Sequence, residues 1–176
     1  ENDWDTNQTP MSNFRNTHWG MTKEEVINIE KSLLLYENEK MLVYEGDLSG
    51  YDTTFAYMFL NKNKVLSRCI YSFVFEHTNP NLYIDDYNKI VDEVSNKYGK
   101  PKEEKQIWSR DLFKNNKSDY GLAVSLGDLR CITLWETEDN HITLQLKGDN
   151  YKISIILIYW RKEFDNPDKE RNSIKL

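Results

Sequence analysis

The residues of this chain that could perform acid–base or nucleophilic chemistry are its histidines and its pairs of adjacent acids. These are His18, His77, His141, Glu24-Glu25, Asp85-Asp86 and Glu103-Glu104. Nucleophilic catalysis needs a base beside its nucleophile, and no local spacing in the chain brings a histidine into that position. The first two acid pairs stand in the opening turns of expected helices, where they complement the helix dipole, and the third follows Pro101 in a connecting segment. We therefore expect no catalytic residue.

Motifs that hold a metal ion or a cofactor are also absent from the sequence. It has no glycine-rich phosphate loop, no H-E-x-x-H, no G-x-S-x-G and no EF-hand loop. Cys69 and Cys131 lie in separate strand-like runs without a C-x-x-C motif, which argues against zinc. The favoured interpretation is two buried free thiols, and a disulfide between the two halves is the alternative. We expect no cofactor and no metal.

The composition is that of a globular domain that does not bind nucleic acid. The formal net charge is -6 over 176 residues, whereas nucleic-acid binding needs clustered cations. The longest apolar stretch, residues 153–160, is too short to span a bilayer. A content of 39% hydrophobic and 13% aromatic residues supplies a core. The composition does not define the oligomeric state.

Two amphipathic helices are predicted. Thr22 and Glu25 form a T-x-x-E capping box, and Val26, Ile29 and Leu33 follow at helical spacing. The second helix begins near residue 82. Its apolar stripe recurs every three or four residues, at Tyr83, Tyr87, Ile90, Val94 and Tyr98. Gly99 is placed to end this helix in a left-handed cap.

Runs of alternating residues predict the strands. They cover residues 41–45, 51–60, 65–76, 105–109, 120–126, 129–137, 141–147 and 151–160. Tight turns between such runs make neighbours antiparallel, and residues 110–119 form a polar loop. The expected fold is α+β: an antiparallel sheet of about seven or eight strands with two helices packed on one face, as a duplicated helix-plus-meander unit. The other face is exposed unless something covers it.

This pattern predicts one domain between two polar ends. The expected boundaries are a flexible leader at 1–16, a domain at 17–162 made of repeats at about 19–76 and 82–160, and a charged tail at 163–176. The polar leader and the start at Glu1 favour an extracellular or cell-envelope protein, with a lipoprotein as one form of it.

Aromatic residues are the candidate binding residues. They are Trp108, Trp135, Tyr159 and Trp160, all in the second set of strands. Neighbours on a strand point to opposite faces, so Tyr159 and Trp160 cannot both face the helices. Exposed aromatic side chains on an open sheet are typical of interface hot spots. The alternative is that the tail or a loop covers them.

A short motif resembles a known family. The resemblance lies in Phe14-Arg15-Asn16 followed by Trp19-Gly20-Met21-Thr22-Lys23-Glu24-Glu25-Val26, and in Tyr98-Gly99-Lys100-Pro101. These residues are similar to the α/β repeat of β-lactamase-inhibitor-protein-like domains and of the small SmpA/OmlA-type outer-membrane assembly lipoproteins. The second repeat lacks the W-G-M-T opening. The resemblance implies an exported, non-enzymatic domain that binds proteins through its sheet, and it transfers no binding residue.

The leading functional hypothesis is therefore a non-enzymatic binding module that recognises a protein. The alternative is a small-ligand-binding or enzymatic domain that uses a pocket between the helices and the loop at residues 110–119. A purely structural or immunity-type protein is a third possibility that the composition does not separate from the first.

Overall fold

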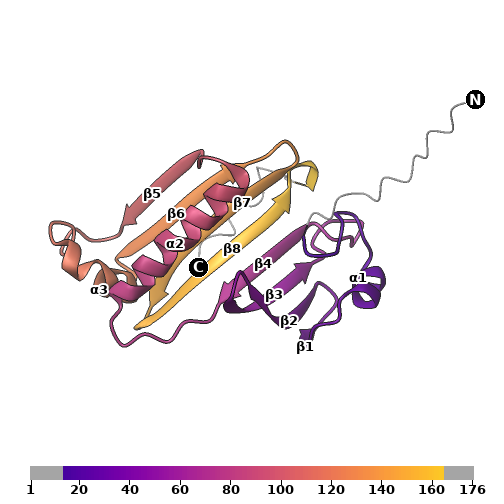
Figure 1. Cartoon of the computed structure of the whole chain (residues 1–176), viewed down its shortest axis with the longest axis horizontal. Helices are drawn as coiled ribbons and strands as arrows, with labels where there is room; N and C mark the ends of the chain where they lie inside the picture. Colours follow the sequence, from indigo (N-terminus) through magenta and orange to yellow (C-terminus); the bar gives the residue numbers. More distant parts are fainter. Residues whose placement is uncertain (1–13, 165–176) are drawn as a thin grey trace, which may run out of the picture.

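The alternating runs and the capped helices assemble into one eight-stranded antiparallel sheet with three α-helices. The computed structural model describes residues 14–164 (Figure 1). The first half holds α1 (Lys23–Ile29), β1 (Leu34–Glu37), β2 (Met41–Leu48), β3 (Tyr51–Met58) and β4 (Arg68–Phe73). The second half holds α2 (Asn81–Tyr98), β5 (Glu103–Trp108), α3 (Tyr120–Ser125), β6 (Leu129–Glu136), β7 (Asn140–Asp149) and β8 (Lys152–Arg161). Two 3-10 turns are η1 (Lys117–Asp119) and η2 (Lys162–Phe164).

The strand order confirms the duplicated unit at the level of topology. The order is β1-β2-β3-β4-β8-β7-β6-β5, so each half is a helix followed by a four-stranded meander. The halves join where β4 pairs with β8 in antiparallel register, from Arg68 opposite Trp160 to Phe73 opposite Ile155. The sequence-based expectation of an α+β antiparallel sheet is confirmed, and α3 is an additional helix.

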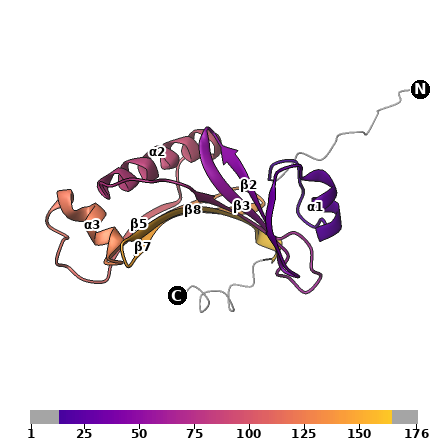
Figure 2. The same cartoon turned by 90° about the horizontal axis from the view of Figure 1, so that it is seen from below.

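The helices cover one face of the sheet, as predicted. One cross-strand row of this covered face consists of the buried residues Leu42, Tyr57, Cys69, Tyr159, Ile142 and Trp135. Over the second half, α2 contributes the Tyr87 hydroxyl, which lies 2.8 Å from the Thr133 hydroxyl. Over the first half, the Tyr57 hydroxyl donates to the Glu30 carboxylate after α1, at 2.7 Å. Figure 2 shows α2 on the convex side of the arched strands β7 and β8.

Phe14 corrects the expected boundary between leader and domain. Its ring is 5% exposed and packs where the two halves meet, with centroid distances of 4.8 Å to Tyr71 and 5.7 Å to Tyr159. Residues 14–16 therefore belong to the domain, and at the other end Glu163 and Phe164 form part of η2. The rest of the predicted leader and tail, residues 1–13 and 165–176, lies outside the described residues.

The first helix begins as predicted and ends earlier. The capping box between Thr22 and Glu25 is present. The Glu30 carboxylate accepts hydrogen bonds from the backbone N–H groups of Lys31 and Ser32, both at 2.9 Å, and this local turn competes with a further helical turn. Leu33 consequently lies outside the helix and is 65% exposed.

The predicted strand at 120–126 is wrong, because this segment is the helix α3. A Cβ on Gly121 would lie 2.4 Å from the Asn81 backbone nitrogen, and the Asn81 side chain accepts the Gly121 N–H at 2.8 Å. This contact seats the segment on the start of α2, and Gly127 ends it with a φ of 78°. The eighth strand is instead β1, which the prediction left out.

Both cysteines are buried free thiols, so the alternative of a disulfide is wrong. Burial raises the pKa of the Cys131 thiol to about 11 and raises the pKa of Cys69 as well. Both groups are therefore neutral near pH 7 and behave as small hydrophobic side chains.

We expect Phe14→Ala to destabilise the fold by about 3–5 kcal/mol, because it opens a cavity between the aromatic rings of the two halves. Urea unfolding of the full chain measures the effect. The matched control is Asn16→Ala at an exposed position, which should change stability by less than about 0.5 kcal/mol. Equal stability of the two variants would mean that Phe14 does not contribute to the folded domain and belongs to the leader.

A second prediction concerns the half-buried Glu30, whose carboxylate pairs with Arg15 at 3.2 Å. Burial alone would raise its pKa, but hydrogen bonds from Ser32 and Tyr57 and the Arg15 charge outweigh burial and lower it. The stabilisation is therefore present above the unfolded pKa of about 4.3 and is lost as the pH falls through the folded pKa. We expect Glu30→Gln to cost about 2 kcal/mol at pH 7 and progressively less below about pH 4. Urea unfolding at a series of pH values measures the difference, and a pH-independent cost would contradict it.

Candidate binding surface

The face of the sheet opposite the helices is the candidate functional surface, and we call it the open face. The strand register places alternate residues of each strand on it. Its central residues are Thr54, Ala56, Ile70, Ser72, Ile132, Leu134, Thr143, Gln145, Ile156 and Ile158. None of the helices within residues 14–164 packs on these side chains, and the face forms the hollow side of the arch (Figure 2). Most of these side chains are half-buried, and Thr143 and Gln145 are buried, so the face is less exposed than the sequence predicted.

The open face combines an apolar centre with polar groups that have no partner. Ile70, Ile156 and Ile158 lie side by side across β4 and β8 and are half-buried. Thr143 beside them is 3% exposed, and its hydroxyl makes no hydrogen bond. The Trp160 indole N–H is also buried without a partner. Each such group costs the folded chain about 1–3 kcal/mol.

Unpaired charges of opposite sign stand along one end of the open face. Asp47 and Asp52 lie opposite each other on β2 and β3. On β6 and β7, Arg130 and Lys147 lie one residue beyond the paired Cys131 and Leu146. Together with Lys152 and the acidic Asp149 opposite it, they line a hollow of about 640 Å³. None of these six charged residues forms an ion pair within the part of the chain that the structure describes.

Like charges on neighbouring strands destabilise a sheet. A partner that places cations against Asp47 and Asp52, and anions against the Arg130 side, would relieve this repulsion. The arrangement therefore favours a binding partner that carries charges of both signs.

The four aromatic residues predicted to bind divide between the two faces. Trp135 and Tyr159 are 2% and 8% exposed and belong to the core under the helices, so neither can contact a partner. Trp108 lies on the helix side, with its ring 5.0 Å from that of Tyr120. Trp160 is on the open face, opposite His141 and Arg68. The adjacent pair Tyr159 and Trp160 therefore points to opposite faces, as the sequence required.

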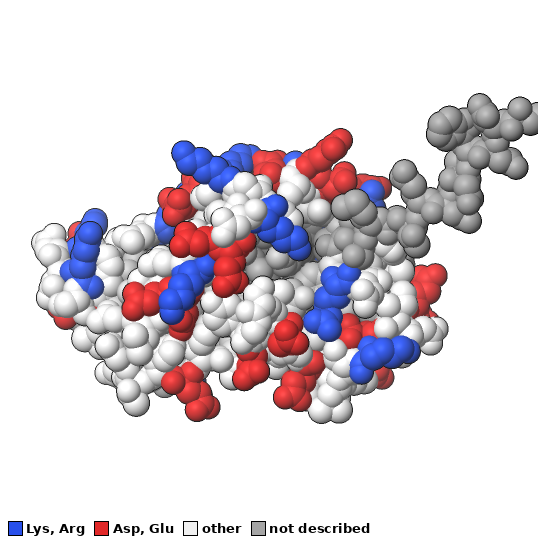
Figure 3. Space-filling model, in the orientation of Figure 1, with Lys and Arg blue, Asp and Glu red and all other residues white. Residues whose placement is uncertain are grey.

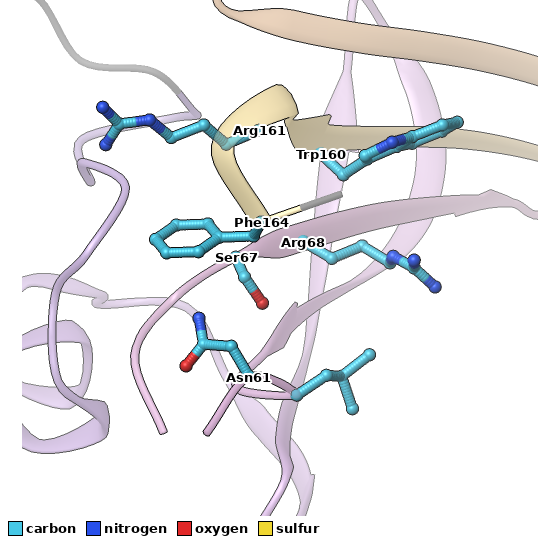
Figure 4. Close-up of a pocket in the computed structure, with 7 residues that line it drawn as sticks. Asn61, Ser67, Arg68, Trp160, Arg161 and Phe164 are labelled. Carbon is cyan, nitrogen blue, oxygen red and sulfur yellow. The ribbon is translucent and has the colours of Figure 1, made fainter. Parts of the chain in front are cut away.

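Trp160 lies at the rim of the open face and not in a ligand pocket. Its ring packs 5.4 Å from the His141 ring and 5.8 Å from the Arg68 guanidinium. In Figure 4, Trp160 and Arg68 point to the same side, away from Phe164. The hollow between these residues, Asn61 and Ser67 measures about 60 Å³, whereas small-molecule sites measure about 300–1,000 Å³.

The alternative site near the loop at residues 110–119 is a shallow hollow of about 270 Å³. It is lined by Asn81, Ile84, Asp85, Gln106, Lys117 and Tyr120. A histidine is missing from this lining, and Asp85 is its single carboxylate. A histidine–carboxylate pair exists elsewhere: His77 Nε2 lies 2.5 Å from Asp86 Oδ2, and the other carboxylate oxygen of Asp86 pairs with Lys89. This pair ties the β4–α2 connection to α2.

Metal-ligand groups do not converge either. Within residues 14–164, no group of three or more histidine, cysteine or acidic side chains is arranged to hold a metal ion. None of the helices in this range is long and apolar enough to cross a membrane.

Comparisons of the chain with protein-family models, with curated proteins and with solved structures give no match. Sequence reasoning missed Thr143 and Gln145, although the strict alternation of residues 141–147 set them opposite the apolar Ile142 and Leu144. That alternation was the available signal.

Two tryptophan substitutions should separate core from surface. We expect Trp135→Ala to cost about 3–5 kcal/mol, because it empties a buried site and removes a hydrogen bond to Ser95. Trp160→Ala should cost less than about 2 kcal/mol, since this ring is half-buried and its N–H makes no bond. Denaturant unfolding compares the two, and equal losses would make Trp160 a core residue.

Proposed function

We propose that this chain is a non-enzymatic module that binds a protein partner through the open face. The observation that supports this most is the row of half-buried isoleucines on β4 and β8, which no helix within residues 14–164 covers: Ile70, Ile156 and Ile158. Apolar residues at the centre of a patch with polar groups around them are the usual composition of a protein interface.

The charge pattern favours a protein over a nucleic acid. Nucleic acids need a continuous basic surface, whereas the open face carries acids at Asp47 and Asp52 and bases at Arg130 and Lys147. On the helix side, Figure 3 shows acidic and basic side chains interspersed. A protein can present both signs at once, which gives specificity and orientation as well as affinity.

Export to the cell envelope or the extracellular space is part of the same proposal. It is supported by the resemblance of the opening motif to exported β-lactamase-inhibitor-protein-like and SmpA/OmlA-type domains. A helix-plus-meander unit repeated along the chain agrees with the fold that this resemblance implied. Reading the codons upstream of Glu1 tests export: a signal peptide supports it, and an initiator Met directly before Glu1 contradicts it.

Binding through the open face is tested by placing a photo-crosslinking amino acid in the full chain. One protein carries it at Ile158, at the centre of the open face, and a matched protein carries it at the exposed Asn88 on α2. With extract from the producing organism, we expect one partner to crosslink at residue 158 and at least about tenfold less at residue 88.

Two substitutions then test whether capture of the partner depends on the side chains of the open face. With the crosslinking amino acid kept at residue 158, Ile156→Lys should abolish capture and Trp160→Ala should reduce it, with circular dichroism showing that both variants remain folded. Equal capture by the wild type and both variants would overturn the proposal.

A further inference from the structure

The outer strand β1 is an unusually apolar edge of the sheet. Four consecutive residues, Leu33, Leu34, Leu35 and Tyr36, are 65%, 41%, 49% and 53% exposed. β1 stands last in the strand order, so only β2 pairs with it within residues 14–164 (Figure 1). An edge strand with unpaired backbone groups and apolar side chains is a template for another strand.

The opposite edge of the same sheet is protected in the usual way. β5 begins with Glu103, Glu104 and Lys105, all exposed, and charged side chains discourage pairing with a further strand. The two edges therefore differ, and the apolar one needs its own explanation.

We propose that β1 pairs with β1 of a second copy of this chain, antiparallel, to give a dimer with one continuous sheet. The charges flanking the apolar run are self-complementary: Lys31 stands three residues before β1, and Glu37, 4.0 Å from Lys23 of its own chain, ends it. With Leu34 opposite Leu34 of the second copy, each Leu33 lies opposite a Leu35, and an extended backbone before β1 would set each Lys31 opposite a Glu37. A parallel pairing would place like charges together, so the charges select the antiparallel twofold arrangement.

The pairing of β1 with β2 also supports a second β1 as the neighbour of this edge. A bulge sets Leu34 opposite Tyr44 and Tyr36 opposite Val43, so Leu35 has no partner residue on β2. Residues 33–40 are all exposed, so no described side chain shields this edge. A second β1 would supply the missing neighbours of the leucines and bonds for the backbone groups of the edge.

This dimer is distinct from the binding proposed for the open face. A twofold axis perpendicular to the sheet leaves both open faces uncovered and on the same side of the extended sheet. The pair would therefore present two binding surfaces together, which raises the apparent affinity for a partner with repeated sites.

The test is analytical ultracentrifugation of the full chain over a range of concentrations. We expect the wild type to dimerise reversibly, and Leu34→Lys to abolish the dimer. The matched control is Leu112→Lys, at a leucine that is 75% exposed in the loop after β5 and should leave the dimer unchanged. A wild type that stays monomeric up to about 1 mM, or a dimer that Leu34→Lys does not alter, would overturn the proposal.

Charge exchange tests the register. Lys31→Glu and Glu37→Lys should each weaken the dimer about tenfold, because each creates two pairs of like charges. The double variant, and an equimolar mixture of the two single variants, should return to within about threefold of the wild type. Additive weakening in the double variant would exclude this pairing. A Leu34→Lys protein that carries the crosslinking amino acid at residue 158 should still capture the partner of the open face. Failure of the dimer proposal can therefore be distinguished from failure of the proposed binding function.

Discussion

The pairing of β4 with β8 is the interaction on which the rest of the structure depends. Each half of the chain builds only a four-stranded meander, and these two strands merge the meanders into a single sheet. On the covered side, the rings of Phe14, Tyr71 and Tyr159 close the core over this junction. On the other side, Ile70 lies next to Ile158, so the centre of the open face exists only once the halves are joined.

Local signals predicted the elements that local physics controls. The Thr22–Glu25 capping box, the stripe along α2 and the Gly99 cap with φ 88° were all readable, since each needs only neighbouring residues. The failures have non-local causes. The α3 segment alternates like a strand but becomes a helix against Asn81, and Phe14 joins the domain through rings that lie far along the chain.

The candidate surface was predictable in kind and not in detail. Strand geometry required Tyr159 and Trp160 to face opposite ways, but only the assembled sheet shows that Trp160 is the one on the open face. The opposed charges were beyond sequence reasoning because Asp47 and Arg130 share an end of the sheet through the register of several strands. A pattern along one strand cannot supply that register.

The junction between the halves also bears on how the chain folds. Every other strand pair joins neighbours in sequence, whereas Tyr71 must find Leu157 across the whole second half. Closing so long a loop is the entropically most expensive step, so we infer that it comes late, after each meander has formed from its own hairpins. Until then β4 and β8 are bare edges, and the chain is most open to misassembly with another copy at the moment when it is nearly complete.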